Sequence, residues 1–135
     1  MAVIDASIAL AWCFDDEATP STDALLDRVR IEGAVTPDLW RLELSNVLLQ
    51  AERRGRISAS DVARRLELID TLAISTDDET TRRAWRDVLT LARSERLTTY
   101  DASYLELAIR RGVSLFTLDG DLAGAAQRRG VSVEP

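Results

Sequence analysis

Short apolar segments alternate with longer amphipathic ones along the whole chain, and this alternation limits the possible folds more than any other feature. Segments rich in Val, Ile and Thr predict buried strands at residues 2–4, 34–36, 74–76, 113–118 and 131–133. Helical periodicity and helix start and stop signals predict helices at residues 8–14, 19–33, 38–54, 58–72, 78–96, 100–111 and 119–129. Strands that alternate with helices usually pair in parallel, so we expect a three-layer α/β/α sandwich around a mostly parallel five-stranded sheet.

The length and composition predict one globular domain that spans residues 1–135. Hydrophobic residues make up 46% of the chain and charged residues 30%, which is enough apolar material for a full core. No apolar run approaches the roughly 18 residues of a membrane span, and a strand at residue 2 leaves no room for a signal peptide. The single cysteine, Cys13, cannot form an internal disulfide. We therefore expect a cytoplasmic protein with no membrane segment.

The basic residues exclude several kinds of chemistry. All 17 are arginine, and the chain contains neither lysine nor histidine. Nucleophiles activated by histidine, His/Cys zinc sites, Walker lysines and Schiff bases are therefore excluded. The net charge of −6 argues against binding of nucleic acid by bulk electrostatics, although a local arginine face is still allowed. What remains is chemistry by carboxylates, hydroxyls, arginines and a bound metal.

Two aspartates directly follow the two clearest predicted strands. Asp5 follows residues 2–4, and Asp119 follows residues 113–118. Parallel strands end at one edge of the sheet, where ligands bind in open α/β folds. Each aspartate could also serve only as a helix cap, and Asp121 could be a helix-stabilising acid of the first turn.

Two further acids are predicted to lie near the same edge. On the helix at residues 38–54, Glu43 borders an apolar stripe that should face the core, and Asn46 lies one turn further on. That stripe comprises Trp40, Leu44, Val47, Leu48 and Ala51. Asp101 falls in the first turn of a largely apolar helix, where capping alone would explain an acid.

Asp5, Glu43, Asp101 and Asp119 could together form an acidic cluster. Carboxylates that lie close together repel one another and raise each other's pKa, and a hard divalent cation relieves this repulsion. Oxygen ligands suit Mg²⁺, or alternatively Mn²⁺, better than zinc. Such ions can activate water and stabilise displacement at phosphorus, so the residues themselves point to a phosphodiesterase. We also expect that replacing one acid with its amide stabilises the metal-free protein.

Four motifs resemble the PIN-domain proteins, and specifically the VapC-type toxins of toxin–antitoxin pairs. The motifs are V-I-D-A-S at 3–7, L-E-L-S-N-V-L at 42–48, T-Y-D-A-S-Y-L-E-L-A at 99–108 and L-F-T-L-D at 115–119. They occur in the family's order and spacing and span nearly the whole chain. By position, the resemblance makes Asp5, Glu43, Asp101 and Asp119 the catalytic, metal-binding acids, with Ser7, Asn46 and Thr117 in support. Asp121 is a second candidate for the fourth acid, but Asp119 is favoured because it directly ends the strand.

The resemblance implies a Mg²⁺-dependent endoribonuclease that acts as the toxin of such a pair. It further implies a homodimer, a cognate antitoxin as partner, and tRNA, rRNA or mRNA as substrate. The alternative is a catalytically inactive PIN fold that binds RNA or protein. A receiver domain is excluded because its site needs a lysine, and a haloacid-dehalogenase-type phosphatase because Ser7 stands where its second aspartate should be.

Overall fold

The computed structural model describes the whole chain, residues 1–135, and its centre is a five-stranded sheet. The strands are β1 (Ala2–Ile4), β2 (Ala34–Pro37), β3 (Ile74–Asp77), β4 (Leu115–Phe116) and β5 (Val133–Glu134). They lie in the order β3-β2-β1-β4-β5, and every neighbouring pair is parallel. The predicted α/β class and five-stranded parallel sheet are therefore confirmed, with β1 in the middle.

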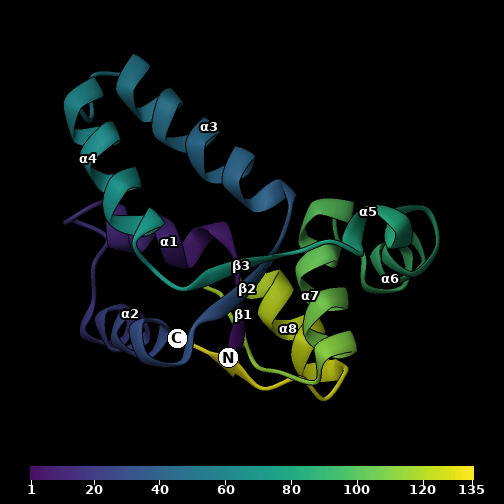
Figure 1. Cartoon of the computed structure of the whole chain (residues 1–135). Coiled ribbons are helices and arrows are strands. Elements are labelled where there is room, and N and C mark those ends of the chain that lie inside the picture. The colour runs from purple at the N-terminus through teal and green to yellow at the C-terminus, as the bar shows by residue number, and fades with distance from the viewer.

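Helices cover both faces of this sheet. They are α1 (Ala6–Cys13), α2 (Pro20–Glu32), α3 (Leu39–Arg53), α4 (Ala59–Asp70), α5 (Thr80–Arg83), the π-helical turn η1 (Ala84–Val88), α6 (Leu89–Glu95), α7 (Thr99–Arg111) and α8 (Gly120–Arg128). In Figure 1, α1 and α2 lie on one side of the strands and α7 and α8 on the other. The α3–α4 hairpin stands above the carboxyl ends of the strands, opposite α5. No helix is long and apolar enough to cross a membrane.

Capping residues at the helix ends explain where several helices begin and end. Thr19 directly precedes Pro20 and forms a capping box with Thr22, and Gly33 ends α2 with a φ of 75°. Ser58 caps α4 through the Asp61 N–H, as the sequence predicts. These local signals fix where α2 and α4 begin, and packing of α2 against α1 and of α4 against α3 then holds them.

The two C-terminal strands differ from the prediction. The strand predicted at residues 113–118 contains only Leu115 and Phe116. Before the strand, the Val113 N–H donates to the Ala108 carbonyl and completes the end of α7, and after it the Thr117 hydroxyl donates to the Asp5 carboxylate. The strand predicted at 131–133 begins only at Val133, because the Val131 N–H donates to the Ala126 carbonyl and completes the end of α8.

Two helix predictions also need correction. The helix predicted at residues 78–96 begins at Thr80, because Asp77 accepts hydrogen bonds from the Glu79 N–H and the Thr80 hydroxyl and holds this turn outside the helix. It also contains the π-helical turn η1. Val47, which was predicted to face the core, is 37% exposed. It lies at the edge of the buried stripe of α3, one turn from Glu43.

Candidate active site

Asp5 is buried at the carboxyl end of the central strand and is held by three donors. Its Oδ1 accepts from the Ser7 hydroxyl at 2.6 Å and from the Ile8 N–H at 3.2 Å, and its Oδ2 accepts from the Thr117 hydroxyl. Burial raises the pKa of Asp5, although these hydrogen bonds act in the opposite direction. The Ile8 bond also makes Asp5 the N-cap of α1. Asp5 therefore caps a helix and still presents a fixed carboxylate.

Ser7 and Thr117 link β1 to the chain that leaves β4. The Ser7 hydroxyl accepts from the Leu118 N–H at 2.9 Å while it donates to Asp5. The Thr117 hydroxyl accepts from the Asp119 N–H at 3.0 Å while it also donates to Asp5. Both hydroxyls thus use their donor and acceptor capacity to hold the two strand ends together. Ser7 was an alternative cap for α1, but the cap bond goes to Asp5.

Asp101 shows most directly that acids converge here. It lies in the first turn of α7, which Thr98 caps through the Asp101 N–H, so the local capping role belongs to Thr98. The pKa of Asp101 is raised to about 6, first by burial and then by the negative charges of Asp119, Glu43, Asp5 and Asp121. Segments far apart in the sequence therefore bring their carboxylates within electrostatic reach of one another.

Glu43 reaches the same region from α3 and is held by Tyr104. The Tyr104 hydroxyl donates to Glu43 Oε1, and burial together with this bond raises the pKa of the phenol well above its usual range. Tyr104 was not predicted to be a site residue. Its position three residues after Asp101 could have indicated it, because residues three apart on a helix share a face.

The last two acids and Asn46 lie at the margin of this group. Asp119 is half-buried and caps α8 through the Leu122 N–H at 2.9 Å. Asp121 is exposed in the first turn of α8. Asn46 is exposed on α3 and forms no hydrogen bond with the acids. The negative charges of Asp119 and Asp121 both raise the pKa of Asp101, so both residues stay candidates for the fourth acidic position.

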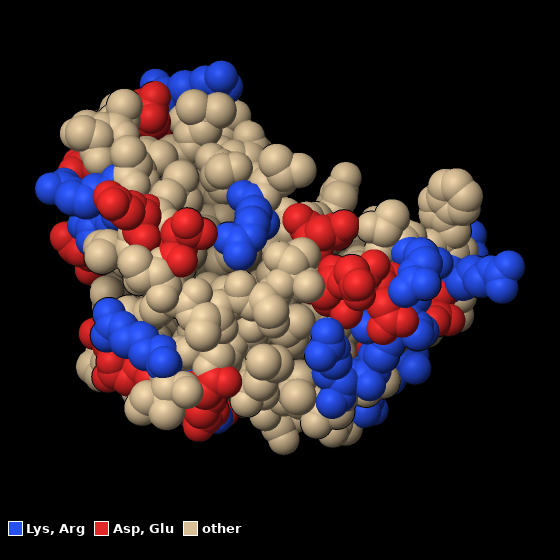
Figure 2. Space-filling view, viewed as in Figure 1, with Lys and Arg blue, Asp and Glu red and all other residues tan.

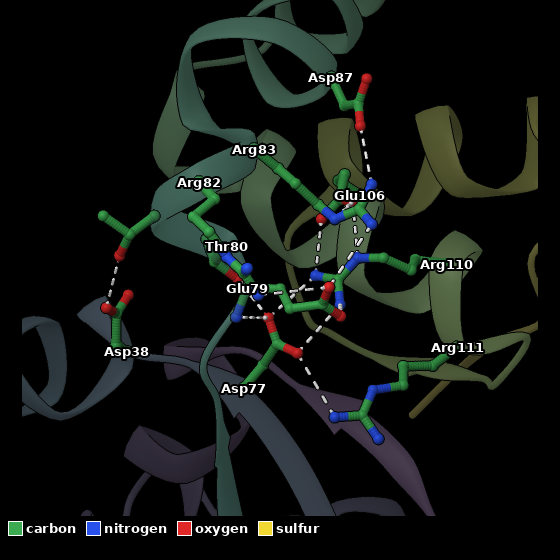
Figure 3. A network of polar contacts seen from close by, with 11 residues as sticks. Asp38, Asp77, Glu79, Thr80, Arg82, Arg83, Asp87, Glu106, Arg110 and Arg111 are labelled. Atoms are coloured by element: carbon green, nitrogen blue, oxygen red, sulfur yellow. Dashed lines mark hydrogen bonds and ion pairs between the residues drawn. The ribbon is translucent and has the colours of Figure 1, made fainter.

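A third strand-end aspartate, Asp77, shows how the fold treats an acid that it neutralises. Its fully buried carboxylate accepts from Arg110 at 3.0 and 2.9 Å and from Arg111 at 3.4 Å, and Arg110 also binds Glu79 and Glu106 (Figure 3). The Arg110 guanidinium holds the pKa of Asp77 well below its usual range.

No arginine forms an ion pair with Asp5, Glu43, Asp101, Asp119 or Asp121. Figure 2 shows that acidic side chains on the α5–α7 side of this face of the molecule have arginines beside them. Asp5, Glu43, Asp101, Asp119 and Asp121 differ from Asp77 because none of them is paired with an arginine.

This donor set suits a hard divalent cation, because it consists of carboxylate oxygens whose charges oppose one another. No three of the acids lie close enough together to hold a metal ion in the arrangement seen here. Asp5 accepts from three donors, Glu43 from Tyr104 and Asp119 from the Leu122 N–H, whereas Asp101 and Asp121 accept no side-chain hydrogen bond. A bound cation would draw these carboxylates together.

Comparisons with known proteins agree on the fold. The sequence profile described as the PIN domain matches residues 2–127. The chain is 28% identical over 121 residues to Ribonuclease VapC3 of Pyrobaculum aerophilum, which covers 90% of this chain and 91% of that protein. The crystal structure of PAE2754 from the same organism is similar with a TM-score of 0.71 at 24% identity, over 98% of this chain and 87% of that one.

Two further solved structures share the fold at lower identity. Mycobacterium tuberculosis VapC20, described as a sarcin-ricin loop cleaving toxin, has a TM-score of 0.69 at 17% identity and is covered completely, as is this chain. FitAcB of Neisseria gonorrhoeae has a TM-score of 0.58 at 16% identity, over 100% of this chain and 97% of that one.

Proposed function

The chain belongs to the PIN domain family, and from this premise we propose that it is a metal-dependent endoribonuclease that acts as the toxin of a toxin–antitoxin pair. The observation that carries the proposal is the set of carboxylates that surrounds Asp101 without a single arginine partner. Uncompensated acids of this kind destabilise a fold, so they imply a cation that offsets the repulsion. The similarity to a ribonuclease and to an RNA-cleaving toxin supports RNA as the substrate.

Asp5, Asp101, Glu43 and Asp119 would hold Mg²⁺, or Mn²⁺ in its place. When bound, such an ion would lower the pKa of a water nucleophile and would offset the negative charge that develops on the phosphoryl oxygens. Ser7 and Thr117 fix the orientation of the Asp5 carboxylate, because each donates to one of its oxygens. Tyr104 fixes Glu43 in the same way, and the N-cap bond to Leu122 fixes Asp119. The chain thus contributes oriented acids, which is the main requirement of such a site.

The partners follow from this role. Because the sequence motifs resemble those of VapC-type toxins, we propose a cognate antitoxin as the partner and a homodimer as the assembly. The substrate is a cytoplasmic tRNA, rRNA or mRNA, and the protein acts in the cytoplasm. VapC20 is described as cleaving the sarcin-ricin loop, but at 17% identity this does not transfer to the present chain.

Removal of the metal should abolish cleavage. We expect purified protein, freed of any antitoxin, to cut RNA with Mg²⁺ or Mn²⁺ and to lose the activity in EDTA, because the uncompensated acids cannot activate water alone. Incubation with total RNA and mapping of the new ends measures this, and re-addition of Mg²⁺ is the control for irreversible loss. Unchanged cleavage in EDTA contradicts the metal mechanism, and metal-independent RNA binding without any cleavage favours an inactive binding module.

Cleavage should also fall as the pH drops below neutrality. The pKa of Asp101 is about 6 in the metal-free protein, so lowering the pH from 7 to 5 protonates this ligand and should slow cleavage at limiting Mg²⁺ by about tenfold. Added Mg²⁺ should restore part of the rate at pH 5.5, because the ion competes with the proton. A flat rate between pH 5 and pH 7 at limiting Mg²⁺ contradicts a role for Asp101 as ligand.

The raised pKa of Asp101 should also make the stability of the metal-free protein depend on pH, in the direction opposite to that of cleavage. Asp101 binds its proton more tightly in the folded state than its ordinary pKa of 3.8 allows. The free energy of unfolding of the metal-free protein should therefore decrease as the pH rises from about 4 to about 6 through this group. Melting curves across this range provide the control for the activity measurements.

A further inference from the structure

The balance between arginines and acids differs at one place on the surface. In every other ion-pair group of the chain, the acids equal or outnumber the basic groups. The exception is Glu95 at the end of α6, which pairs with both Arg128 and Arg129 at the end of α8, each at 2.9 Å. Two further arginines lie within one helical turn of Glu95 along the chain and form neither an ion pair nor a side-chain hydrogen bond. We call these four residues the arginine patch: Arg93, Arg96, Arg128 and Arg129.

The arginine patch presents positive charge to solvent and covers its one acid. The side chain of Glu95 is 8% exposed, whereas those of Arg128 and Arg129 are 60% and 40% exposed. Arg93 and Arg96 are exposed as well. The patch is therefore locally positive although the whole chain carries a net charge of −6, and it is the kind of local arginine face that this composition still allows.

One face of α8 connects the patch to the acids. Asp121 and Arg128 are seven residues apart, so they lie on the same face of the helix, and Gly124 lies between them. Arg128 Nη1 lies 3.4 Å from the point where a Cβ of Gly124 would stand, so this guanidinium extends back along the helix toward Asp121. The positive charge thus begins about one helical turn from an acid whose charge acts on Asp101.

Arg96 approaches the acids through the connection between α6 and α7. It lies two residues before Thr98, which caps α7 through the Asp101 N–H. Its backbone is left-handed, with a φ of 56°, a conformation that costs free energy for any residue with a side chain. No ion pair or hydrogen bond of its guanidinium offsets this cost. The stability of the fold therefore does not explain an arginine at this position.

Phosphate is the partner that the composition of the patch favours. No large apolar side chain of α6 or α8 is exposed, whereas protein interfaces centre on apolar and aromatic side chains. A two-fold contact between two copies of the chain at the patch would place the same arginines against one another, which is unfavourable. The planar guanidinium of arginine, by contrast, binds two phosphate oxygens at once.

We propose that the arginine patch binds the phosphate backbone of the RNA, which then runs along the exposed face of α8 from Arg128 to the acids. This inference rests on the proposed ribonuclease function and locates the face of the protein that holds the substrate. Contacts to phosphates carry no sequence information, so the patch contributes affinity and position and leaves the choice of sequence to other residues. Its arginines are binding residues and take no part in the chemical step.

The test compares RNA binding by two double variants with the same change of charge. Arg93→Gln/Arg96→Gln removes two charges of the patch. Arg53→Gln/Arg54→Gln is the matched control, because it removes two exposed arginines without ion pairs at the far end of α3, away from α6 and α8 (Figure 1). The probe is a fluorescein-labelled single-stranded RNA, and its anisotropy is measured in EDTA, which prevents cleavage, over a series of KCl concentrations.

The patch variant should lose both affinity and salt dependence. We expect its binding to be about tenfold weaker at low salt, and the slope of log affinity against log salt to fall by about 1.4, because each phosphate contact of a single strand contributes about 0.7. The control variant should keep the wild-type affinity and slope. Arg128→Gln is a second variant, expected to weaken binding about threefold, since Arg129 still pairs with Glu95.

The outcomes separate this inference from the proposed function. Melting curves of the patch variant should match the wild type, because neither arginine has a partner in the fold, and Arg128→Gln decides the matter if they do not. Equal affinities of the patch and control variants overturn the inference, as does an unchanged salt slope. Poly-glutamate that competes as well as unlabelled RNA, charge for charge, assigns the patch to an acidic protein and also overturns it. A wild type that neither cleaves nor binds RNA overturns the proposed function itself, whereas intact wild-type cleavage with unchanged binding by the patch variant overturns only this inference.

Discussion

Asp101→Asn is expected to lower the rate of RNA cleavage by about a thousandfold or more while the protein stays folded. Asp101 is the acid on which the other carboxylates converge, and it has no side-chain hydrogen bond that the amide would break. The substitution removes a metal ligand and one of the mutually repelling charges at once. Thermal melts without metal should therefore show the variant to be at least as stable as the wild type.

The controls for this experiment come from the same chain. Asp23 is an exposed acid in the first turn of α2, so Asp23→Asn removes a first-turn charge far from the site and should leave cleavage unchanged. Cleavage by Asp101→Asn within tenfold of the wild-type rate would refute the assignment. Asp5→Asn is less suitable as a test. Ser7, Ile8 and Thr117 donate to the two oxygens of the Asp5 carboxylate, and an amide offers only one oxygen as acceptor. The expectation that removal of an acid stabilises the metal-free protein is therefore restricted to Asp101.

Arg110→Met is expected to cause the largest loss of stability, about 3–5 kcal/mol of unfolding free energy. Arg110 is 13% exposed and binds Asp77, which is fully buried, and Glu106, which is 8% exposed. Methionine keeps much of the length of the side chain but leaves both carboxylates without their main partner. Denaturant unfolding measures the loss. Arg30→Met is the control, because Arg30 and Asp27 form an exposed pair on α2 and its removal should change stability little.

The pH dependence identifies the cause of this loss. In the wild type, Arg110 holds the pKa of Asp77 below its ordinary value of 3.8, so the stabilisation is present above about pH 4 and disappears as the pH falls further. In Arg110→Met the buried acids lack that partner and should take up protons at higher pH. The stability deficit of the variant should therefore shrink from pH 7 to pH 4. A constant deficit would indicate lost packing instead of unpaired charge.

Local sequence signals account for the sheet and for most of the helices. The β-branched segments, the Thr19-Pro20 start and the Gly33 stop predict elements that the structure contains. They fail where a tertiary hydrogen bond competes with the local preference. The regular strand β4 ends at Phe116 and the Thr117 hydroxyl donates to Asp5, and Asp77 delays the next helix to Thr80. A single sequence does not reveal such long-range partners.

Local sequence also indicates some residues of the candidate site and not others. Asp5 and Asp119 are indicated by their positions after strands and Glu43 by its place on α3, and the structure brings all three within electrostatic reach of Asp101. Asp77 gives the same strand-end signal as Asp5, yet Arg110 neutralises it from 33 positions away. The difference between a structural and a potentially metal-binding acid therefore lies in its partners. Local sequence left Asp101 ambiguous and gave no reason to include Tyr104 as the donor to Glu43.

The hydrogen bonds between residues 5–7 and residues 117–119 join the beginning of the chain to a segment near its end. During synthesis, the Asp5 carboxylate is made first but receives its Thr117 donor only after more than a hundred further residues have been added. Asp101 from α7, Glu43 from α3 and Asp119 after β4 must also be present before the acids can act on one another. The candidate site is therefore complete only after nearly the whole chain has been synthesised, so the fold itself sets the earliest point at which its acids can act together.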